Sequence, residues 1–231
     1  MSKFIITIDG PAASGKGSLS KKISEDFNLY YMETGIYYRG FASLFYKNKR
    51  NNFDLSNFIS DLDVKDFKEY LINNKKLYST EITKLASKLA KIVQVRLFIV
   101  KMQQEAITNL DQGFNGIILE GRDCGTVVAP EADLKFYLTS NLKIRAKRRF
   151  NQFVKEKKDI SFKQVIDDLI ARDKQDENRE HSPLRIPKDA VVVDNSNYDF
   201  EATINIVKNI IFSRIPSLKY KINILKVGKH E

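Results

Sequence analysis

A glycine-rich loop between a short apolar run and a helical pattern constrains this chain more than any other feature. The run Phe4–Ile8 is typical of a buried strand, and the apolar periodicity of a helix starts near Lys16. Backbone N–H groups of such a loop curl around phosphate oxygens, and the helix N-terminus adds its positive end. The sequence therefore predicts a P-loop that binds a nucleoside triphosphate or a similar anion. Its residues are Gly10, Pro11, Ala12, Ala13, Ser14, Gly15, Lys16, Gly17 and Ser18.

Two residues of this loop carry chemistry beyond the backbone. Lys16 supplies a mobile positive charge to the β- and γ-phosphates, so we predict it to be catalytic. The strict motif has Ser or Thr directly after the lysine, whereas here Gly17 intervenes and the hydroxyl belongs to Ser18. This shift argues against direct coordination of Mg²⁺ by Ser18. A contact between Ser18 and the ion through a water molecule remains open.

Four further apolar runs suit buried parallel strands: Leu29 to Met32, Gly116 to Leu119, Leu134 to Leu138, and Ala190 to Val193. Helical segments lie between them, which predicts crossover βαβ units and an α/β core. About 80 residues from Ile36 to Asn115 contain no clear buried strand and form a predicted insertion. The polar, charged segment from Arg145 to Arg179 is predicted to be helical and to move as a lid.

Arginines follow two of these strands. Arg39 comes after the Gly turn of Glu33-Thr34-Gly35, and Arg122-Asp123 follows the third strand. Ligands of an open α/β sheet bind at the carboxyl ends of the strands, so Arg122 and Asp123 are expected to face the same crevice as Lys16. Arg39 could hold an acceptor phosphate with two parallel hydrogen bonds.

The composition excludes several other classes. There are 39 Lys and Arg against 29 Asp and Glu, so the net charge of +10 indicates anionic partners. No apolar run approaches the roughly 18 residues of a membrane helix, and we expect a soluble, cytoplasmic protein. Cys124 is the only cysteine and is expected only to pack. His181 and His230 with that cysteine do not make a zinc site.

Four segments together identify a family resemblance. They are the P-loop, Glu33–Arg39 of the form (Asp/Glu)-Thr-Gly-x-x-Tyr-Arg, Glu120–Val128 of the form Glu-Gly-Arg-Asp-x-Gly-Thr-Val-Val, and Arg172–Arg179 of the form Arg-Asp-x-x-Asp-x-x-Arg. In this order they resemble the bacterial cytidylate kinases of the nucleoside monophosphate kinase superfamily, over roughly Phe4 to Phe212.

The resemblance implies a single domain over residues 1–231 with the P-loop nucleoside monophosphate kinase fold. That fold is a five-stranded parallel sheet flanked by helices, with a monophosphate-binding insertion and a lid. The expected core is 1–35, 113–144 and 180–215, the insertion about 36–112, the lid about 145–179, and a basic tail 216–231. The implied reaction transfers the γ-phosphoryl group of ATP to CMP or dCMP, with Mg²⁺, in a monomer.

The resemblance also implies site residues. Lys16, Arg148 and Arg179 are expected to be catalytic, since phosphoryl transfer needs positioning and charge neutralisation rather than a covalent nucleophile. Arg145 is weighed between a phosphate contact and a solvated ion-pair face, and Asp194-Asn195-Ser196 is expected near the adenine. The residues implied to bind CMP are Thr34, Arg39, Ser87, Arg96, Arg122, Asp123, Arg172 and Asp176.

Some features depart from the family pattern. Glu33 stands where the family more often has Asp, and 61–76 is short and helix-like where the family has a small antiparallel sheet. The usual arginine of the insertion is replaced near Ser79. Ser87 and Arg96 are nine residues apart, which puts them half a turn out of phase on one helix. Both can reach cytosine only if the helix breaks between them.

Two alternatives remain open from the sequence. One is a P-loop kinase for another nucleoside monophosphate or a small alcohol. A panel of substrates with ATP would distinguish such an enzyme from a cytidylate kinase. The other is a P-loop nucleic-acid-binding regulator that uses the positive charge. We do not expect nucleic acid as a partner, because Arg39, Arg122 and Arg172 form a predicted acceptor site that such a regulator would not need.

Overall fold

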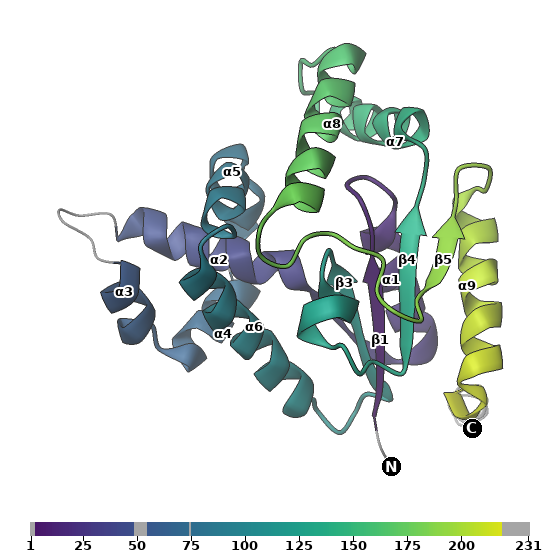
Figure 1. Cartoon of the computed structure of the whole chain (residues 1–231), viewed down its shortest axis with the longest axis horizontal. Coiled ribbons are helices and arrows are strands. Elements are labelled where there is room, and N and C mark those ends of the chain that lie inside the picture. The colour runs from purple at the N-terminus through teal and green to yellow at the C-terminus, as the bar shows by residue number, and fades with distance from the viewer. Residues whose placement is uncertain (1–2, 49–54, 74, 219–231) are drawn as a thin grey trace. The chain divides into compact units, whose positions relative to one another are not determined.

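The computed structural model describes residues 3–48, 55–73 and 75–218, and it contains a five-stranded sheet (Figure 1). The strands are β1 (Phe4–Asp9), β2 (Leu29–Glu33), β3 (Gly116–Gly121), β4 (Leu134–Thr139) and β5 (Val191–Asp194), in the order β2-β3-β1-β4-β5. β1 is parallel to β3 and β4, and β4 is parallel to β5. The predicted parallel α/β sheet is confirmed, with every strand within two residues of its predicted bounds.

The register of the sheet brings the carboxyl ends of its strands together. Asp9, the last residue of β1, lies opposite Gly121 of β3 and Tyr137 of β4. The segments after β1, β3 and β4 therefore start side by side, which is where an open α/β sheet binds its ligands.

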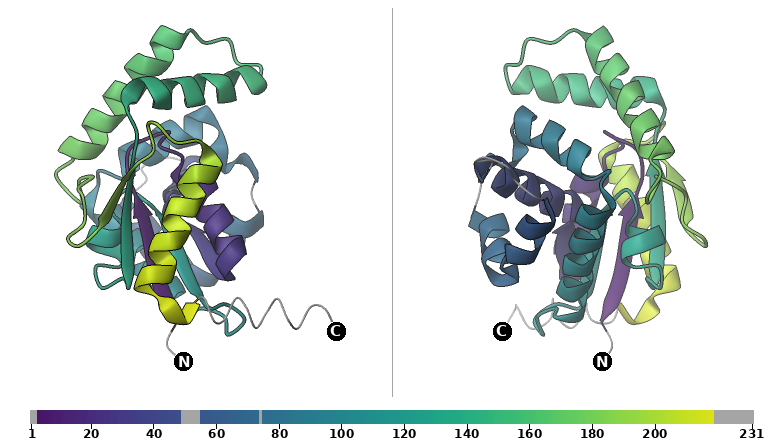
Figure 2. Two further views of the ribbon diagram at one scale, coloured as in Figure 1. Left: turned by 90° about the vertical axis from the view of Figure 1, so that its right-hand side faces the viewer. Right: turned by 60° about the vertical axis from the view of Figure 1, so that its left-hand side comes forward.

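Two helices close one face of the sheet. α1 (Lys16–Phe27) and α9 (Phe200–Arg214) contact each other, and their apolar side chains share one buried cluster with the strands. Leu19 and Ile23 of α1 and Val207 and Ile211 of α9 are all at most 1% exposed. Figure 2 shows α9 lying along the strands. This cluster holds the first turn of α1, and with it the P-loop, in a fixed position.

A pair of helices lies beyond the carboxyl ends of the strands (Figure 2). α7 (Leu142–Lys155) and α8 (Phe162–Asn178) pack through a small apolar cluster that also includes Ala12 of the P-loop. α8 begins at a capping box formed by Ser161 and Gln164. The helical structure predicted for 145–179 is confirmed, although α7 starts three residues earlier. The predicted motion of this segment stays a prediction.

The described residues up to Met32 and from Leu110 form one compact unit, and Glu33–Asn109 form a second. The second unit contains α2 (Thr34–Lys47), α3 (Leu55–Asp61), α4 (Val64–Asn73), the short η1 (Lys75–Tyr78), α5 (Thr80–Leu89) and α6 (Val93–Thr108). Buried aromatic and aliphatic side chains form its core, among them Phe41, Phe67, Leu77, Val95 and Ile99. The helix-like reading of 61–76 is confirmed over α4 and η1.

Some predictions fall outside what the structure describes. Residues 219–231 of the predicted basic tail, including His230, lie outside the described residues. The predicted boundaries of core, insertion, lid and tail stay predictions. In the described part of the chain, every helix is too short or too polar to cross a bilayer.

Candidate active site

The P-loop needs its glycines because its backbone turns sharply against the sheet. Gly10 has φ +148°, and a Cβ there would lie 2.0 Å from the carbonyl oxygen of Leu138 in β4. Gly15, with φ +95°, caps the N-terminus of α1. Both conformations disfavour any residue with a side chain. The loop therefore fits between β1 and α1 only with glycine at these two positions.

Side chains from other elements hold the outer carbonyls of the loop. Arg145 of α7 donates to the carbonyl oxygen of Ala12 at 3.1 Å and to Oδ2 of Asp173 at 2.5 Å. Asn195, after β5, donates from Nδ2 to the carbonyl oxygen of Ser14 at 3.0 Å. Arg148 donates to Ser14 O at 3.3 Å and to Asn195 Oδ1 at 2.9 Å. The loop is thus preorganised by contacts outside its own sequence.

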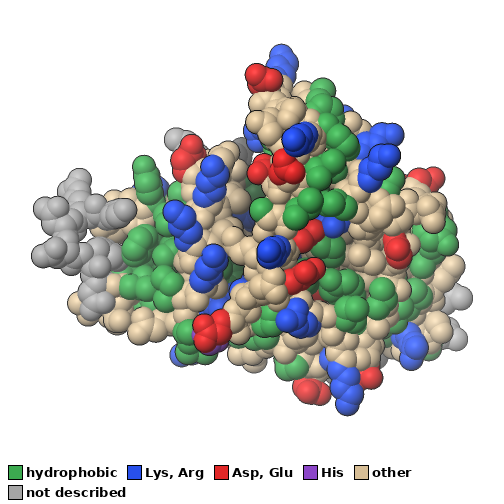
Figure 3. Space-filling view, turned by 45° about the horizontal axis from the view of Figure 1, so that its top comes forward, with side chains coloured by type: hydrophobic (Ala, Val, Ile, Leu, Met, Phe, Trp, Pro, Cys, Tyr) green, Lys and Arg blue, Asp and Glu red, His purple; other side chains and the backbone are tan. Residues whose placement is uncertain are grey.

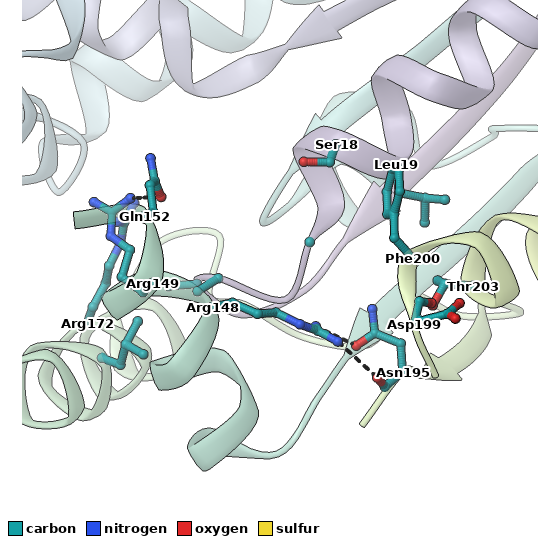
Figure 4. Close-up of a pocket in the computed structure, with 14 residues that line it drawn as sticks. Ser18, Leu19, Arg148, Arg149, Gln152, Arg172, Asn195, Asp199, Phe200 and Thr203 are labelled. Atoms are coloured by element: carbon teal, nitrogen blue, oxygen red, sulfur yellow. Dashed lines mark hydrogen bonds between the residues drawn. The ribbon is translucent and has the colours of Figure 1, made fainter. Parts of the chain in front are cut away.

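A cavity of about 500 Å³ opens beside this loop (Figure 4). In Figure 4, Arg148 of α7 extends toward Asn195, while Ser18 and Leu19 belong to α1 and Phe200 and Thr203 to α9. The cavity thus has a polar wall of arginines and an apolar part at α1 and α9. Its lining residues are Ala12, Ala13, Gly15, Ser18, Leu19, Arg148, Arg149, Gln152, Leu169, Arg172, Asn195, Asp199, Phe200 and Thr203.

Lys16 is buried at the base of the loop. Its Nζ donates to the carbonyl oxygen of Pro11 at 2.9 Å and lies 3.7 Å from Oε1 of Glu120. Burial, together with the positive charges of Arg122 and Arg172, lowers the pKa of Lys16 to about 7, and the charge of Glu120 opposes part of this shift. An anion placed between these cations would be strongly attracted, and it would restore the proton on Lys16.

Asp9 connects the start of the P-loop to the segment after β3. Its carboxylate accepts hydrogen bonds from the backbone N–H of Cys124 at 2.9 Å and of Gly125 at 2.8 Å, in the short helix η2 (Cys124–Val128). Burial raises the pKa of Asp9 to about 6, although these two N–H groups favour the ionised form. Cys124 is fully buried, but it does more than pack, because a hydrogen bond from its side chain also favours the ionised form of Asp9.

A second polar cluster lies between η2 and the end of α8. Arg122 Nε donates to Oδ2 of Asp176 at 2.9 Å. Arg179 lies 3.9 Å from carboxylate oxygens of both Asp123 and Asp176, and its Nε also donates to the carbonyl oxygen of Ser182. The structure therefore brings together four of the sequence-predicted residues, two arginines and two aspartates. In it Arg179, predicted as catalytic, lies beside aspartates predicted to bind CMP, while Arg172 lines the cavity of the P-loop.

In the second unit, each predicted arginine is stacked on a tyrosine. Arg39 lies over the ring of Tyr78 at 4.8 Å from its centroid, and Arg96 over Tyr38 at 5.5 Å. Arg39 also pairs with Glu33 at 2.5 Å. Arg96 is buried and donates to the carbonyl oxygen of Ala90 at 3.1 Å.

The remaining predicted residues of this unit are Thr34 and Ser87. Thr34 is buried at the start of α2, where its carbonyl oxygen accepts from Gln103 at 3.0 Å. Ser87 Oγ donates to the carbonyl oxygen of Thr83 at 3.0 Å within α5. α5 ends at Leu89 and α6 starts at Val93, so the helix does break between Ser87 and Arg96. The condition for both to reach one base is met.

The charged side chains bear on the nucleic-acid alternative. On the face drawn in Figure 3, Lys and Arg side chains are spread over the surface, with Asp, Glu and apolar side chains among them. Among the described residues, no group of three or more His, Cys, Asp or Glu is placed to hold a metal ion.

Sequence reasoning only partly anticipated the residues that shape the site. Arg145 is neither a solvated ion-pair residue nor a lining residue of the cavity, since it is 8% exposed and holds the P-loop. Asn195 was expected near the adenine, and it lines the cavity. Phe200 and Thr203 were missed, and their i, i+3 spacing at the start of a helix after the fifth strand is the signal that could have found them.

A family model and curated relatives both match most of this chain. The cytidylate kinase family model matches residues 6–213. A cytidylate kinase of Bartonella henselae is 39% identical over 206 residues, which are 89% of this chain and 93% of the relative. A cytidylate kinase of Mycoplasma capricolum is 40% identical, over 90% of this chain and 96% of the relative.

Solved structures agree on the fold. The Thermus thermophilus protein TT1252 superposes with a TM-score of 0.52 at 13% identity, over 93% of this chain and 99% of that one. An uncharacterised protein from Eubacterium ventriosum gives 0.51 at 11% identity, over 91% and 99%. Because the family model matches most of its length and relatives at 39% and 40% identity cover about 90% of it, this chain belongs to the cytidylate kinase family.

Proposed function

We propose that this protein transfers the γ-phosphoryl group of ATP to CMP or dCMP, giving ADP and CDP or dCDP. The observation that carries the proposal is the cavity lined by the P-loop on one side and by Arg148 and Arg172 on the other. Such a cavity suits a polyphosphate, because backbone N–H groups and guanidinium groups converge on it. The family membership specifies the two nucleotides.

ATP binds with its phosphates in the P-loop, from Gly10 to Ser18. Its base and ribose extend toward the apolar end of the cavity, where Leu19 and Phe200 offer surface and Asn195 offers polar atoms. Mg²⁺ accompanies the phosphates. Ser18 lines the cavity and carries a hard oxygen donor, so it would hold the ion through a water molecule, as Mg²⁺ retains most of its hydration shell. The bound ion would neutralise phosphate charge.

Catalysis rests on positioning and on neutralisation of the transferring group. Lys16 contributes a charge from within the loop, and Arg148 and Arg179 contribute theirs from α7 and from the end of α8. The acceptor is the phosphate of CMP itself, so no side chain is needed as a nucleophile. Exclusion of water by these helices protects ATP from hydrolysis.

The acceptor nucleotide is bound by residues of three kinds. Guanidinium groups hold its phosphate, and Asp176 with Arg172 contacts its pentose. Cytosine is recognised by Ser87, Arg96 and Asp123, of which Asp123 accepts a hydrogen bond from the exocyclic amine. Uracil presents a carbonyl at that position, and two facing acceptors repel. The proposed residues are Thr34, Arg39, Ser87, Arg96, Arg122, Asp123, Arg172 and Asp176. We also propose that the enzyme acts as a monomer in the cytoplasm.

A coupled phosphoryl-transfer assay across CMP, dCMP, UMP, AMP and GMP with ATP and Mg²⁺ tests the proposal. CMP and dCMP should give the highest kcat/KM. Lys16→Ala should lower kcat by about a hundredfold or more, the loss expected for a group that stabilises transition-state charge. Lys21→Ala, an exposed lysine on the same helix, serves as the matched control. A higher kcat/KM with UMP, AMP or GMP would overturn the proposal, and so would the absence of phosphoryl transfer to any of the five monophosphates.

A further inference from the structure

The guanidinium group of Arg39 is held by two side chains within its own unit. Its Nη1 donates to Oε1 of Glu33 at 2.5 Å, and its plane lies 4.8 Å from the ring centroid of Tyr78. The hydroxyl of Tyr78 donates to the other carboxylate oxygen of Glu33 at 2.7 Å. Each of the three side chains thus contacts the other two.

This triangle fixes the orientation of a side chain that otherwise has several rotatable bonds. The side chains of Glu33 and Arg39 are only 20% and 17% exposed. Gly35 leaves room for this arrangement, because a Cβ at that position would lie 3.3 Å from Nη1 of Arg39. The contact with Glu33 uses Nη1, and the edge formed by Nε and Nη2 is the one that presents two parallel N–H groups to a phosphate.

Tyr78 is anchored by its neighbours in the chain. Leu77 is fully buried in the core of the unit. Ser79 caps α5, since its Oγ accepts from the backbone N–H of Ile82 at 3.3 Å. The backbone of Tyr78 is thus held on both sides, while the residue itself is 56% exposed. A ring held in this way provides a surface for Arg39 without belonging to the hydrophobic core.

We propose that Tyr78 is a positioning residue for the acceptor phosphate, holding the Arg39 guanidinium against Glu33 so that its Nε and Nη2 edge is ready for the phosphate of CMP. This inference rests on the proposed function, in which Arg39 binds that phosphate. Its physical basis is preorganisation: ordering a long side chain before the ligand arrives removes that entropic cost from binding. Stacking on an aromatic ring restricts a guanidinium while leaving its N–H edge accessible.

The hydroxyl of Tyr78 has a separate task. A carboxylate beside the phosphate site repels a dianionic ligand. By donating to Oε2 of Glu33, the hydroxyl keeps this carboxylate turned toward Tyr78 and Arg39. The hydrogen bond also stabilises the negative charge of the carboxylate and so weakens its repulsion of the ligand. The ring and the hydroxyl should therefore contribute separately, which a pair of variants can resolve.

The test is a double-mutant cycle on steady-state kinetics with CMP and ATP. Tyr78→Leu removes ring and hydroxyl, and we expect it to raise KM for CMP by about five- to tenfold, the scale of ordering one long side chain. Tyr78→Phe keeps the ring and should raise it less. KM for ATP should not change in either. Tyr46→Leu is the matched control, because Tyr46 is 60% exposed in the same unit.

Arg39→Ala and the double variant Arg39→Ala/Tyr78→Leu separate the possible outcomes. If Tyr78 acts through Arg39, Tyr78→Leu should add nothing once Arg39 is removed. Additive effects, or a normal KM for CMP in Tyr78→Leu while Arg39→Ala raises it, would overturn the inference alone. An unchanged KM for CMP in Arg39→Ala would show that Arg39 does not bind the acceptor phosphate, which removes that part of the proposed function and this inference with it. Tyr78→Phe, which loses a single oxygen atom, decides the matter if the leucine variant does not fold.

Discussion

Arg122 and Asp176 bind each other: Nε of the arginine donates a hydrogen bond of 2.9 Å to Oδ2 of the aspartate. Burial alone would lower the pKa of Arg122, but the carboxylates of Asp176 and Glu120 outweigh burial and raise it. The resemblance implied a separate contact with CMP for each residue. The structure adds that the pair connects the loop after β3 to α8.

This pair makes Asp176 important for more than a contact to the pentose. Asp176→Ala removes the partner of Arg122 and leaves two arginines, Arg122 and Arg179, close together without it. We expect KM for CMP to rise about ten- to a hundredfold, the cost of breaking a partly buried charge-assisted pair, with a smaller change for ATP. Steady-state kinetics check this, with Asp168→Ala, an exposed position on the same helix, as the control. Equal changes in both KM values would contradict it.

Lys16 should couple ATP binding to proton uptake. In the free protein its pKa is about 7, so at pH 8 the amine is mostly neutral. Bound phosphates raise this pKa, so binding at pH 8 takes up nearly one proton. The sign follows: affinity for ATP should fall as the pH rises above 7, because the proton must then be taken from a more dilute pool.

Titration calorimetry in buffers of different ionisation enthalpy measures this uptake directly. At pH 8 and above the γ-phosphate of ATP is already deprotonated, so the ligand contributes little. Lys16→Met should bind ATP more weakly and without the uptake. Equal proton uptake in the wild type and Lys16→Met would assign it to another group.

Asp9 should leave a signature in the pH dependence of stability. Its pKa is about 6 in the folded protein against an ordinary 3.8, so the folded state holds more protons than the unfolded state between these values. The contribution of Asp9 to the free energy of unfolding should therefore fall as the pH rises from 4 to 6, by about 3 kcal/mol, and stay constant above. Urea unfolding of the wild type and of Asp9→Asn from pH 4 to 7 gives the difference. A difference that does not vary with pH would refute it.

Asp123 should determine the choice between cytosine and uracil. Asp123→Ala removes the acceptor for the exocyclic amine and leaves the P-loop unchanged, so the ratio of kcat/KM for CMP over UMP should shrink by about tenfold or more. Arg179, which lies 3.9 Å from Asp123, loses a partner as well, so kcat is expected to fall with both substrates. The ratio is thus the measurement that matters. An unchanged ratio would transfer base recognition to Ser87 or Arg96.

The sequence predicted the sheet and the P-loop well because both depend on local patterns. Apolar runs mark buried strands, and the glycines of the loop are needed for backbone conformations that other residues rarely adopt, such as φ +148° at Gly10. The stacking of Arg39 on Tyr78 joins residues that are far apart in the chain, and helix or strand periodicity predicts contacts only between residues close in the sequence. Arg145 was ambiguous for the same reason, since only packing shows that its partners are Ala12 and Asp173.

The last prediction concerns α7 and α8, which carry the arginines of the cavity. Arg148, Arg149 and Arg172 line one space, and in the absence of phosphate their like charges oppose close approach. Bound ATP reverses the sign of this interaction and supplies the differential affinity that favours a closed state. Hydrogen exchange across 142–178 should therefore slow when CMP and a non-hydrolysable ATP analogue are both bound.

Arg145 should make the two helices respond together, because its buried guanidinium joins α7 to Asp173 of α8 and to the P-loop carbonyl of Ala12. Arg145→Met keeps much of the volume but removes these bonds. In that variant we expect α8 to gain less protection than α7 on ligand binding, whereas the wild type gains in both. Lys147→Met, an exposed position on α7, is the matched control. Equal protection of free and doubly liganded wild-type protein would rule out a moving lid, and a normal response of α8 in Arg145→Met would show that the helices are coupled by their apolar cluster instead.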